Sequence, residues 1–207
     1  MNKTESSYRV NSDAGIVARS RDSPGEFAQL YDRHARVVFR YVASRLGAES
    51  ADDLTSETFL VAFERRDRYD PAIANALPWL LGIATRLIRR RKRDEIASWR
   101  VLASSHGLGG EGTVHVVHDP CGEADQRIDA GFAVNSIASA IASLPQRDRD
   151  VLTLAAWSEL SSAGIAEALG IPEGTVRSRL HRARRILRTQ LEIVGSARGT
   201  EKDHATA

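Results

Sequence analysis

Apolar positions between residues 27 and 42 recur at intervals of three and four, which is the spacing of one face of an α-helix. The stripe consists of Phe27, Leu30, Tyr31, His34, Val37, Val38, Tyr41 and Val42. Gly47 follows, where a glycine commonly ends a helix. A second helix is predicted from Ser50 to about Arg66, because Ser50 followed by Asp52 and Asp53 resembles a capping box. Its buried side is narrow and comprises Leu54, Thr58, Val61 and Ala62.

A third helix is predicted to begin at Pro78, because proline is favoured in the first turn. Its apolar stripe consists of Leu77, Leu80, Leu81, Ala84, Leu87 and Ile88. A different face carries Trp79, Ile83, Arg86, Arg90 and Arg93.

The periodicity disappears from about Ala103 to Asp125, where glycines are concentrated, and this length indicates a linker rather than a loop. The helical pattern resumes near Ile128 and continues with helices over residues 146–157, from Ser161, and from Pro172 to about Leu191. The predicted fold class is therefore all-α, with two small helical domains joined by a flexible linker. The predicted limits are residues 1–25 for a disordered N-terminal extension, 26–97 and 135–191 for the domains, 98–134 for the linker and 192–207 for a disordered tail.

A short capped helix, a turn with Gly170 and a longer helix together predict a helix-turn-helix motif. If Val176, Leu180, Ala183 and Leu187 face the core, the opposite face carries Gly174, Ser178, His181 and Arg185. The second helix of such a motif lies in the DNA major groove, where arginine contacts guanine and phosphates. The alternative, a plain three-helix packing unit, does not explain so many arginines on the free face.

The formal net charge of +2 says little, but its distribution is informative. One basic block lies within residues 86–93 and another within 177–188, which suggests two surfaces for nucleic acid. A solvated helix face is the alternative for either block alone. Trp79 beside the first block suits melted DNA, whose bases stack on aromatics, although Trp79 could instead belong to the core. Asp53, Glu57 and Glu64 form an acidic stripe that suits a basic protein partner, or is simply solvated.

Several classes of protein are disfavoured. The single cysteine, Cys121, excludes an intrachain disulfide, and neither a signal peptide nor a membrane span is evident, so a cytoplasmic protein without membrane insertion is expected. His115, His118 and Cys121 have the spacing H-x-x-H-x-x-C, but a fourth zinc ligand is not evident. Catalytic motifs are also not evident, so we expect no enzyme activity, cofactor or metal.

The chain resembles the extracytoplasmic-function (ECF) group of bacterial sigma factors, within the sigma-70 family. The resemblance rests on four stretches: FAQLYDRHARVVFRYVASRLG, ADDLTSETFLVAFERRDRYD, LPWLLGIATRLIRRRKR and LPQRDRDVLTLAAWSELSSAGIAEALGIPEGTVRSRLHRARRIL. It covers residues 27–95 and 136–190, and IAEALGIPEGTVRSRLHRAR is its most specific part. It implies an alternative sigma factor that binds core RNA polymerase and directs promoter recognition and initiation in a stress or envelope response.

The resemblance also implies roles for individual residues. The expected core polymerase docking positions are Asp53, Ser56, Glu57 and Leu60. The family often has glutamine in place of Ser56 and asparagine in place of Arg86. Positions expected to contact the upstream promoter element are Thr175, Arg177, Ser178, His181, Arg182 and Arg185. Positions expected to contact the downstream element are Asn75, Trp79, Arg86, Arg89, Arg90 and Arg93.

The loop over residues 68–76 matches the loop that captures a flipped base of the non-template strand. The implied partners are promoter DNA, the clamp helices of the largest polymerase subunit, the flap of the second-largest subunit, and an anti-sigma factor. The alternative from the residues alone is an ordinary helix-turn-helix regulator that binds duplex DNA without core polymerase. The helix over residues 78–93 and the acidic helix disfavour it, because a ligand-sensing regulator needs neither.

Overall fold

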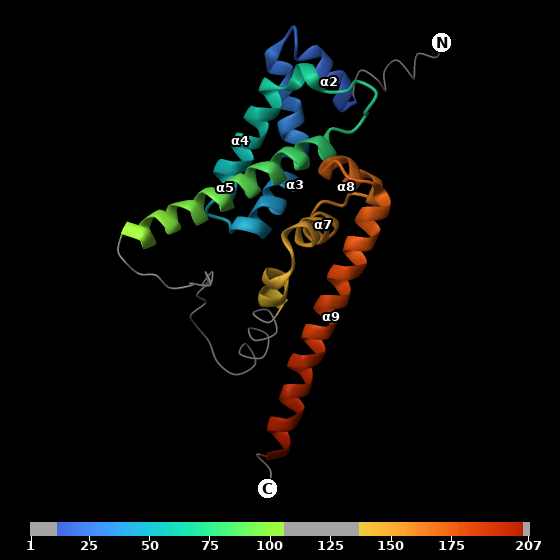
Figure 1. The fold of residues 1–207 in the computed structure, drawn as a ribbon. Helices are drawn as coiled ribbons and strands as arrows, with labels where there is room; N and C mark the ends of the chain where they lie inside the picture. The colour runs from blue at the N-terminus through green and yellow to red at the C-terminus, as the bar shows by residue number, and fades with distance from the viewer. Residues whose placement is uncertain (1–11, 106–136, 205–207) are drawn as a thin grey trace. The chain divides into compact units, whose positions relative to one another are not determined.

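The computed structural model describes residues 12–105 and 137–204, and every regular element in those ranges is helical (Figure 1). The prediction of an all-α fold is confirmed. The chain divides into two compact units, one of residues 1–95 and 150–177 and the other of residues 96–149 and 178–207. The predicted domain limits stay a prediction.

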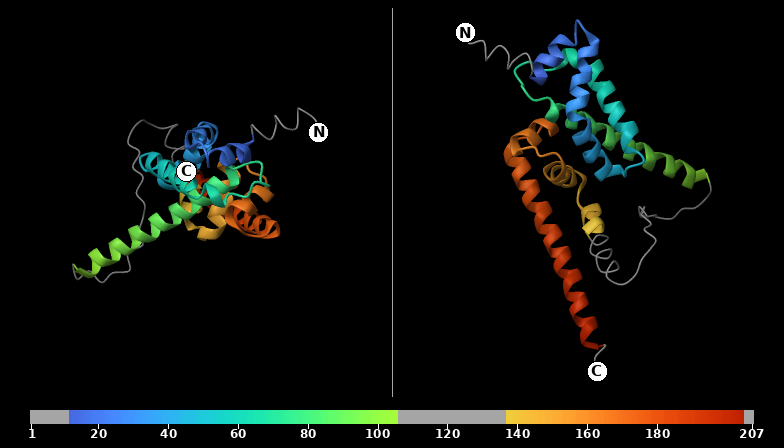
Figure 2. Two further views of the ribbon diagram at one scale, coloured as in Figure 1. Left: turned by 90° about the horizontal axis from the view of Figure 1, so that it is seen from above. Right: turned by 180° about the vertical axis from the view of Figure 1, so that it is seen from behind.

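The first unit is built on α3 (Ala28–Leu46), α4 (Ala51–Glu64) and the first part of α5 (Leu77–Ser105). Helices α3 and α4 pack side by side (Figure 2). Leu30, Tyr41, Leu54, Leu80 and Ile88 are fully buried between these helices and their neighbours in the unit, as the apolar spacing predicts. The Tyr41 hydroxyl lies 2.8 Å from Thr85 Oγ1 and joins α3 to α5.

Short elements complete this part of the unit. The 3₁₀ turn η1 (Pro24–Phe27) leads into α3, and η2 (Arg66–Arg68) follows α4. Gly47 ends α3 with a φ of +83°, a backbone conformation that favours glycine. The expected side-chain cap at Ser50 is wrong: its backbone is helical and it makes no capping hydrogen bond. Helix α4 begins there with support from the acidic residues of its first turn.

The predicted disorder of residues 1–25 is wrong from Ser12 onward. Helix α2 (Asp13–Arg19) lies there, and the Ser12 side chain caps it by accepting a bond from the Gly15 backbone N–H. Ile16 and Val17 are 0% and 1% exposed, so these two adjacent apolar residues help to hold the short helix on the unit. Two apolar residues are too few to define a period, which is why the pattern did not reveal the helix.

The remaining helices of the first unit form the helix-turn-helix. They are α7 (Gln146–Trp157), of which the part from residue 150 onward belongs to this unit, α8 (Ser162–Leu169) and the start of α9 (Glu173–His204). Ser161 caps α8 by accepting a bond from Gly164 N, and Gly170 ends it in the left-handed conformation with a φ of +63°. The predicted cap, turn and helix order are confirmed.

The second unit contains the later part of α9, a helical segment over residues 137–143 and the start of α7. Arg149 connects the start of α7 to the helical segment over residues 137–143. Its guanidinium donates to three carbonyl oxygens at the end of that segment, those of Ile141, Ala142 and Leu144. The last carbonyls of a helix have few donors within the helix itself, so the arginine donates to them, in addition to the bond from Leu144 N to the Ile141 carbonyl at 3.3 Å.

Two helices continue beyond the predicted limits of the domains. Helix α5 continues to Ser105, beyond the predicted linker start at residue 98, and α9 continues to His204 through the predicted tail. In both extensions the regular apolar spacing ends before the helix does. Most of the predicted linker, with His106, His115, His118 and Cys121, lies outside the described residues.

Candidate nucleic-acid interface

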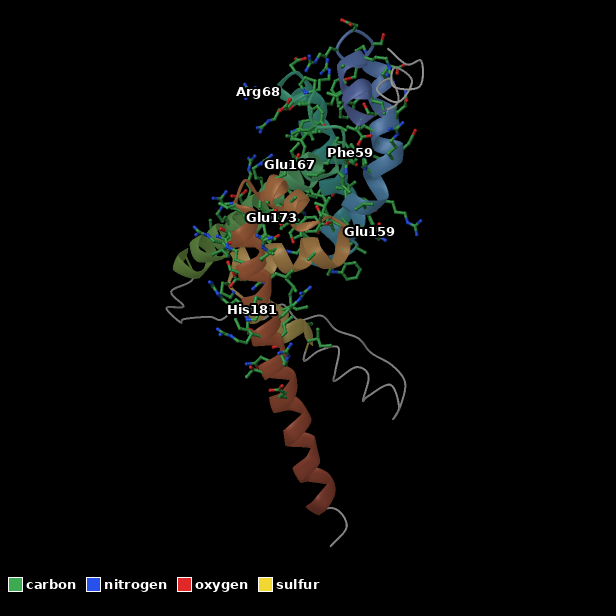
Figure 3. All side chains as sticks on the ribbon, turned by 90° about the vertical axis from the view of Figure 1, so that its right-hand side faces the viewer. Phe59, Arg68, Glu159, Glu167, Glu173 and His181 are labelled. Carbon is green, nitrogen blue, oxygen red and sulfur yellow. The ribbon has the colours of Figure 1, made fainter. Side chains whose placement is uncertain are left out.

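The first turns of α9 present a polar, basic face. Val176 and Ala183 are fully buried, as predicted. The predicted contact residues Arg177, Ser178, His181, Arg182 and Arg185 are exposed, whereas Thr175 is half-buried. Figure 3 shows Glu173 at the start of this helix and His181 further along it. The structure therefore places the predicted upstream-element residues on the free side of the second helix of the motif.

Two arginines of this face are ion-paired. Arg177 Nη1 lies 2.9 Å from Glu173 Oε1, with the arginine side chain 68% exposed. Arg182 Nη1 lies 3.5 Å from Asp148 Oδ2, with the arginine side chain 54% exposed and the aspartate 2% exposed. The Arg177–Glu173 pair is exposed on both sides and contributes less than about 1 kcal/mol, so a DNA phosphate could replace the Glu173 carboxylate. Arg182 also supports a buried carboxylate, so its substitution would change more than the DNA surface.

The basic face of α5 is only partly as predicted. Arg86, Arg90 and Arg93 are exposed. Burial lowers the pKa of Arg86, and so do the neighbouring charges of Arg65 and Arg89, which indicates a locally positive potential. Ile83, expected on this face, is 1% exposed and belongs to the core.

Arg89 is engaged within the first unit. Its Nη2 and Nε atoms lie 2.7 and 2.9 Å from Asp150 Oδ2. Arg45 Nη1 lies 2.7 Å from the other oxygen of the same carboxylate. Asp150 and the Arg45 side chain are 0% and 2% exposed, so this is a buried ionic cluster. The DNA contact expected of Arg89 stays a prediction, and it would require this bond to be exchanged.

The loop before α5 lies beside two aromatic rings in tilted contact. Trp79 is half-buried, with its ring centroid 5.0 Å from that of Tyr69, so it is partly core and partly accessible. Burial raises the pKa of Tyr69 well above its usual range. Asn75 is exposed, and its side-chain oxygen accepts a bond from Leu77 N at 3.0 Å, so it caps α5. The structure therefore brings Asn75 and Trp79 to the same end of α5.

Helix α4 presents the predicted docking row on one side. Asp53, Ser56, Glu57 and Leu60 are all exposed, with Leu60 57% exposed. The neighbouring Phe59, labelled in Figure 3, is 5% exposed. Its ring packs edge-on against that of Tyr31 on α3, and Tyr31 is 44% exposed. The face thus combines acidic residues with exposed apolar area, a composition suited to a protein partner.

Three buried carboxylates were not found from the sequence. Asp13 lies in a segment expected to be disordered, and Asp148 and Asp150 lie in the charged run QRDRD, which is typical of a solvated helix start. No feature of either stretch distinguishes a buried aspartate from an exposed one, because their arginine partners are distant in sequence. Within the described residues, no group of His, Cys, Asp and Glu could hold a metal ion, and no helix could cross a membrane.

The helix-turn-helix and its basic free face define a DNA-binding protein. Comparisons with known proteins agree: residues 30–97 match the model of sigma-70 region 2 and residues 135–187 that of sigma-70 region 4. The chain is 34% identical over 170 residues to the ECF RNA polymerase sigma factor SigL of Mycobacterium tuberculosis, covering 82% of this chain and 90% of SigL. It is 33% identical over 172 residues to the ECF RNA polymerase sigma factor SigW of Bacillus subtilis, covering 80% and 88% respectively.

Solved structures share the fold. CnrH, in complex with the cytosolic domain of CnrY, matches with a TM-score of 0.62 and 21% identity over 88% of this chain and 99% of that chain. The sigma factor RpoE of Bartonella quintana, in complex with the anti-sigma factor NepR, matches with a TM-score of 0.57 and 22% identity. The match covers 81% of this chain and 98% of that chain.

The chain belongs to the ECF RNA polymerase sigma factors. It is an alternative sigma factor that directs promoter recognition, and its partners are core RNA polymerase and promoter DNA. This family is not a class of enzymes. The resemblance drawn from the sequence is confirmed, and the hypothesis of a regulator without polymerase is not favoured.

Proposed function

We propose that the exposed row on α4 docks on the clamp helices of the largest polymerase subunit. Asp53, Ser56, Glu57 and Leu60 are exposed together, and this observation carries the proposal. Their carboxylates would attract a basic surface and set its orientation, while Leu60 and Tyr31 would bury apolar area. Ser56 is shorter than the glutamine that the family often has, so it reaches less far across the interface.

The face of α9 formed by Thr175, Arg177, Ser178, His181, Arg182 and Arg185 would bind the upstream promoter element as duplex DNA. Residues of this kind at the start of a recognition helix reach base edges, and the flanking arginines neutralise phosphates. Such contacts would make binding steeply dependent on salt.

The loop before α5, with Asn75 and Trp79, and the arginines Arg86, Arg90 and Arg93 would bind the melted downstream element. Stacking on an aromatic ring and pairing with cations both suit single-stranded DNA. The C-terminal helices would also contact the flap of the second-largest subunit. The chain would act in the cytoplasm with RNA polymerase. An anti-sigma factor is a further proposed partner, as NepR is for RpoE.

The docking surface is tested by titrating labelled core RNA polymerase with wild-type protein and with Glu57→Lys. We expect the substitution to weaken binding by about tenfold or more, because it places a cation against a basic partner. Asp32→Lys on α3, also exposed, makes the same change of charge and should bind normally. Equal affinities for wild type and Glu57→Lys would refute the docking site.

The upstream contact is tested with Arg185→Ala in transcription with core polymerase, because Arg185 is exposed and lies on the predicted face. Initiation should fall by about tenfold on the native promoter, and the salt dependence of promoter binding should become shallower. Arg184→Ala removes an equal charge from the flank of the same helix and should have a smaller effect. If the two variants reduce initiation equally, α9 contributes only its positive charge, and the specific contact by Arg185 is refuted.

A further inference from the structure

The loop over residues 70–76 is held in a defined shape by short bonds. The Tyr69 hydroxyl donates to the Ile73 carbonyl at 2.6 Å, and the Asp70 side chain accepts from Ala72 N at 2.9 Å. Ile73 N donates to the Asp70 carbonyl at 3.1 Å. These bonds fix the first half of the loop on the buried ring of Tyr69, which is 4% exposed. They do not reach its last residues.

A buried carboxylate from another element holds the end of the loop. Asp13 Oδ2 on α2 accepts a hydrogen bond from Ala76 N at 2.9 Å. Ala76 is 0% exposed and Asp13 6% exposed, so water does not compete for this bond. Ala76 lies directly before α5 and directly after the exposed Asn75, so the bond sets where the loop meets the helix.

Asp13 is itself held by two side chains of α3. Its Oδ2 lies 2.7 Å from His34 Nε2, and its Oδ1 lies 3.0 Å from Arg33 Nη1. Burial alone would raise the pKa of Asp13, but hydrogen bonds from His34, Ala76 and Arg33 hold it below its usual value, so the carboxylate is charged. One charged group thus ties α2, α3 and the loop together.

We propose that Asp13 is a positioning residue for base capture, which fixes the end of the 70–76 loop in the geometry that receives an unpaired promoter base. The inference rests on the proposed role of that loop. Ordering a flexible loop on binding costs conformational entropy and weakens binding. A loop that is already ordered avoids this cost when the base enters. Extruding a base from the duplex costs stacking free energy, which the binding loop must offset. A loop without a fixed end would therefore capture the base less well. Helix α2 precedes residues 30–97, the part that matches the family model, so this anchor is an addition to the matched body.

The test uses the full chain with core polymerase on two templates: an intact promoter and one with an abasic site at the captured position of the non-template strand. We expect Asp13→Ala to reduce open-complex formation on the intact promoter by about tenfold, as expected for one lost bond to a charged group. On the abasic template, wild type and Asp13→Ala should perform equally, because there is no base to position. Affinity for core polymerase and the response to changes in the upstream element should be unaffected.

Asp13→Asn serves as the second variant if Asp13→Ala folds poorly. Its amide oxygen still accepts from Ala76 N but carries no charge for Arg33 and His34, so an intermediate loss is expected on the intact promoter only. If wild type is sensitive to the abasic site and the Asp13 variants initiate normally, the positioning role is overturned. Equal losses on both templates would also overturn it, since they would indicate a purely structural role. If wild type itself ignores the abasic site, base capture by the loop fails, and the inference fails with it.

Discussion

Removing the Asp150 carboxylate should destabilise the protein far more than removing an exposed acid. Asp150 is 0% exposed and bonds to Arg45, which is 2% exposed, and to Arg89, which is 35% exposed. In Asp150→Ala, Arg89 can turn to water but Arg45 cannot. Taking one partner from a buried pair costs about 3–5 kcal/mol, because the other charge stays buried. The Arg89 pair adds at most about 1 kcal/mol, because it is partly exposed.

The assay is urea unfolding followed by far-UV circular dichroism, with the free energy of unfolding extrapolated to water. Glu173→Ala removes the exposed partner of Arg177 and should cost less than about 0.5 kcal/mol. The double substitution Arg45→Met with Asp150→Leu replaces the pair by apolar side chains and should recover stability to within about 1 kcal/mol of wild type. A loss below about 1 kcal/mol for Asp150→Ala would refute the buried cluster, as would a double variant no more stable than Asp150→Ala.

Two further predictions concern the packing around α5. Burial raises the pKa of Tyr41 to about 12 from its ordinary value of 10, so the folded state disfavours the tyrosinate. The stability that Tyr41 provides should be complete below pH 10 and be lost as the pH rises toward 12, by roughly 2–3 kcal/mol. Tyr41→Phe should remove this part of the loss and leave the part due to Tyr69, whose pKa is also raised. A Cβ at Gly82 would lie 2.5 Å from the Ala168 carbonyl oxygen, so Gly82→Ala should lower the thermal midpoint. Gly174→Ala meets nothing within 4 Å and should be neutral or stabilising; equal midpoints for the two variants would contradict this packing.

The long helices were predictable because each carries its own apolar stripe and end residues. Helix α3 has seven positions of the predicted stripe before Gly47, and the shorter α8 has a serine cap and a glycine stop, so local sequence decided both. The exposed faces of α4 and α9 followed from the buried ones, because helical geometry relates the two.

The buried polar contacts were not predictable for the opposite reason. Asp13 meets Ala76, and Asp150 meets Arg45 and Arg89, across separations that no local pattern records. A charged residue in a polar segment looks solvated unless its distant partners are known. For the same reason Arg89 was expected only to contact DNA. Its position on the helix was evident from the sequence, whereas its bond to Asp150 was not.

The bond between Asp13 and Ala76 joins positions 63 residues apart, and this has a consequence for synthesis. At bacterial elongation rates of about 5–20 residues per second, Ala76 leaves the ribosome roughly 3 to 13 seconds after Asp13. Through that interval Ile16 and Val17 have no completed core to enter, and the carboxylate stays hydrated. The bond from Ala76 N to Asp13 can therefore form only after the start of α5 has been made, and the loop acquires its final shape only when α2 packs against it.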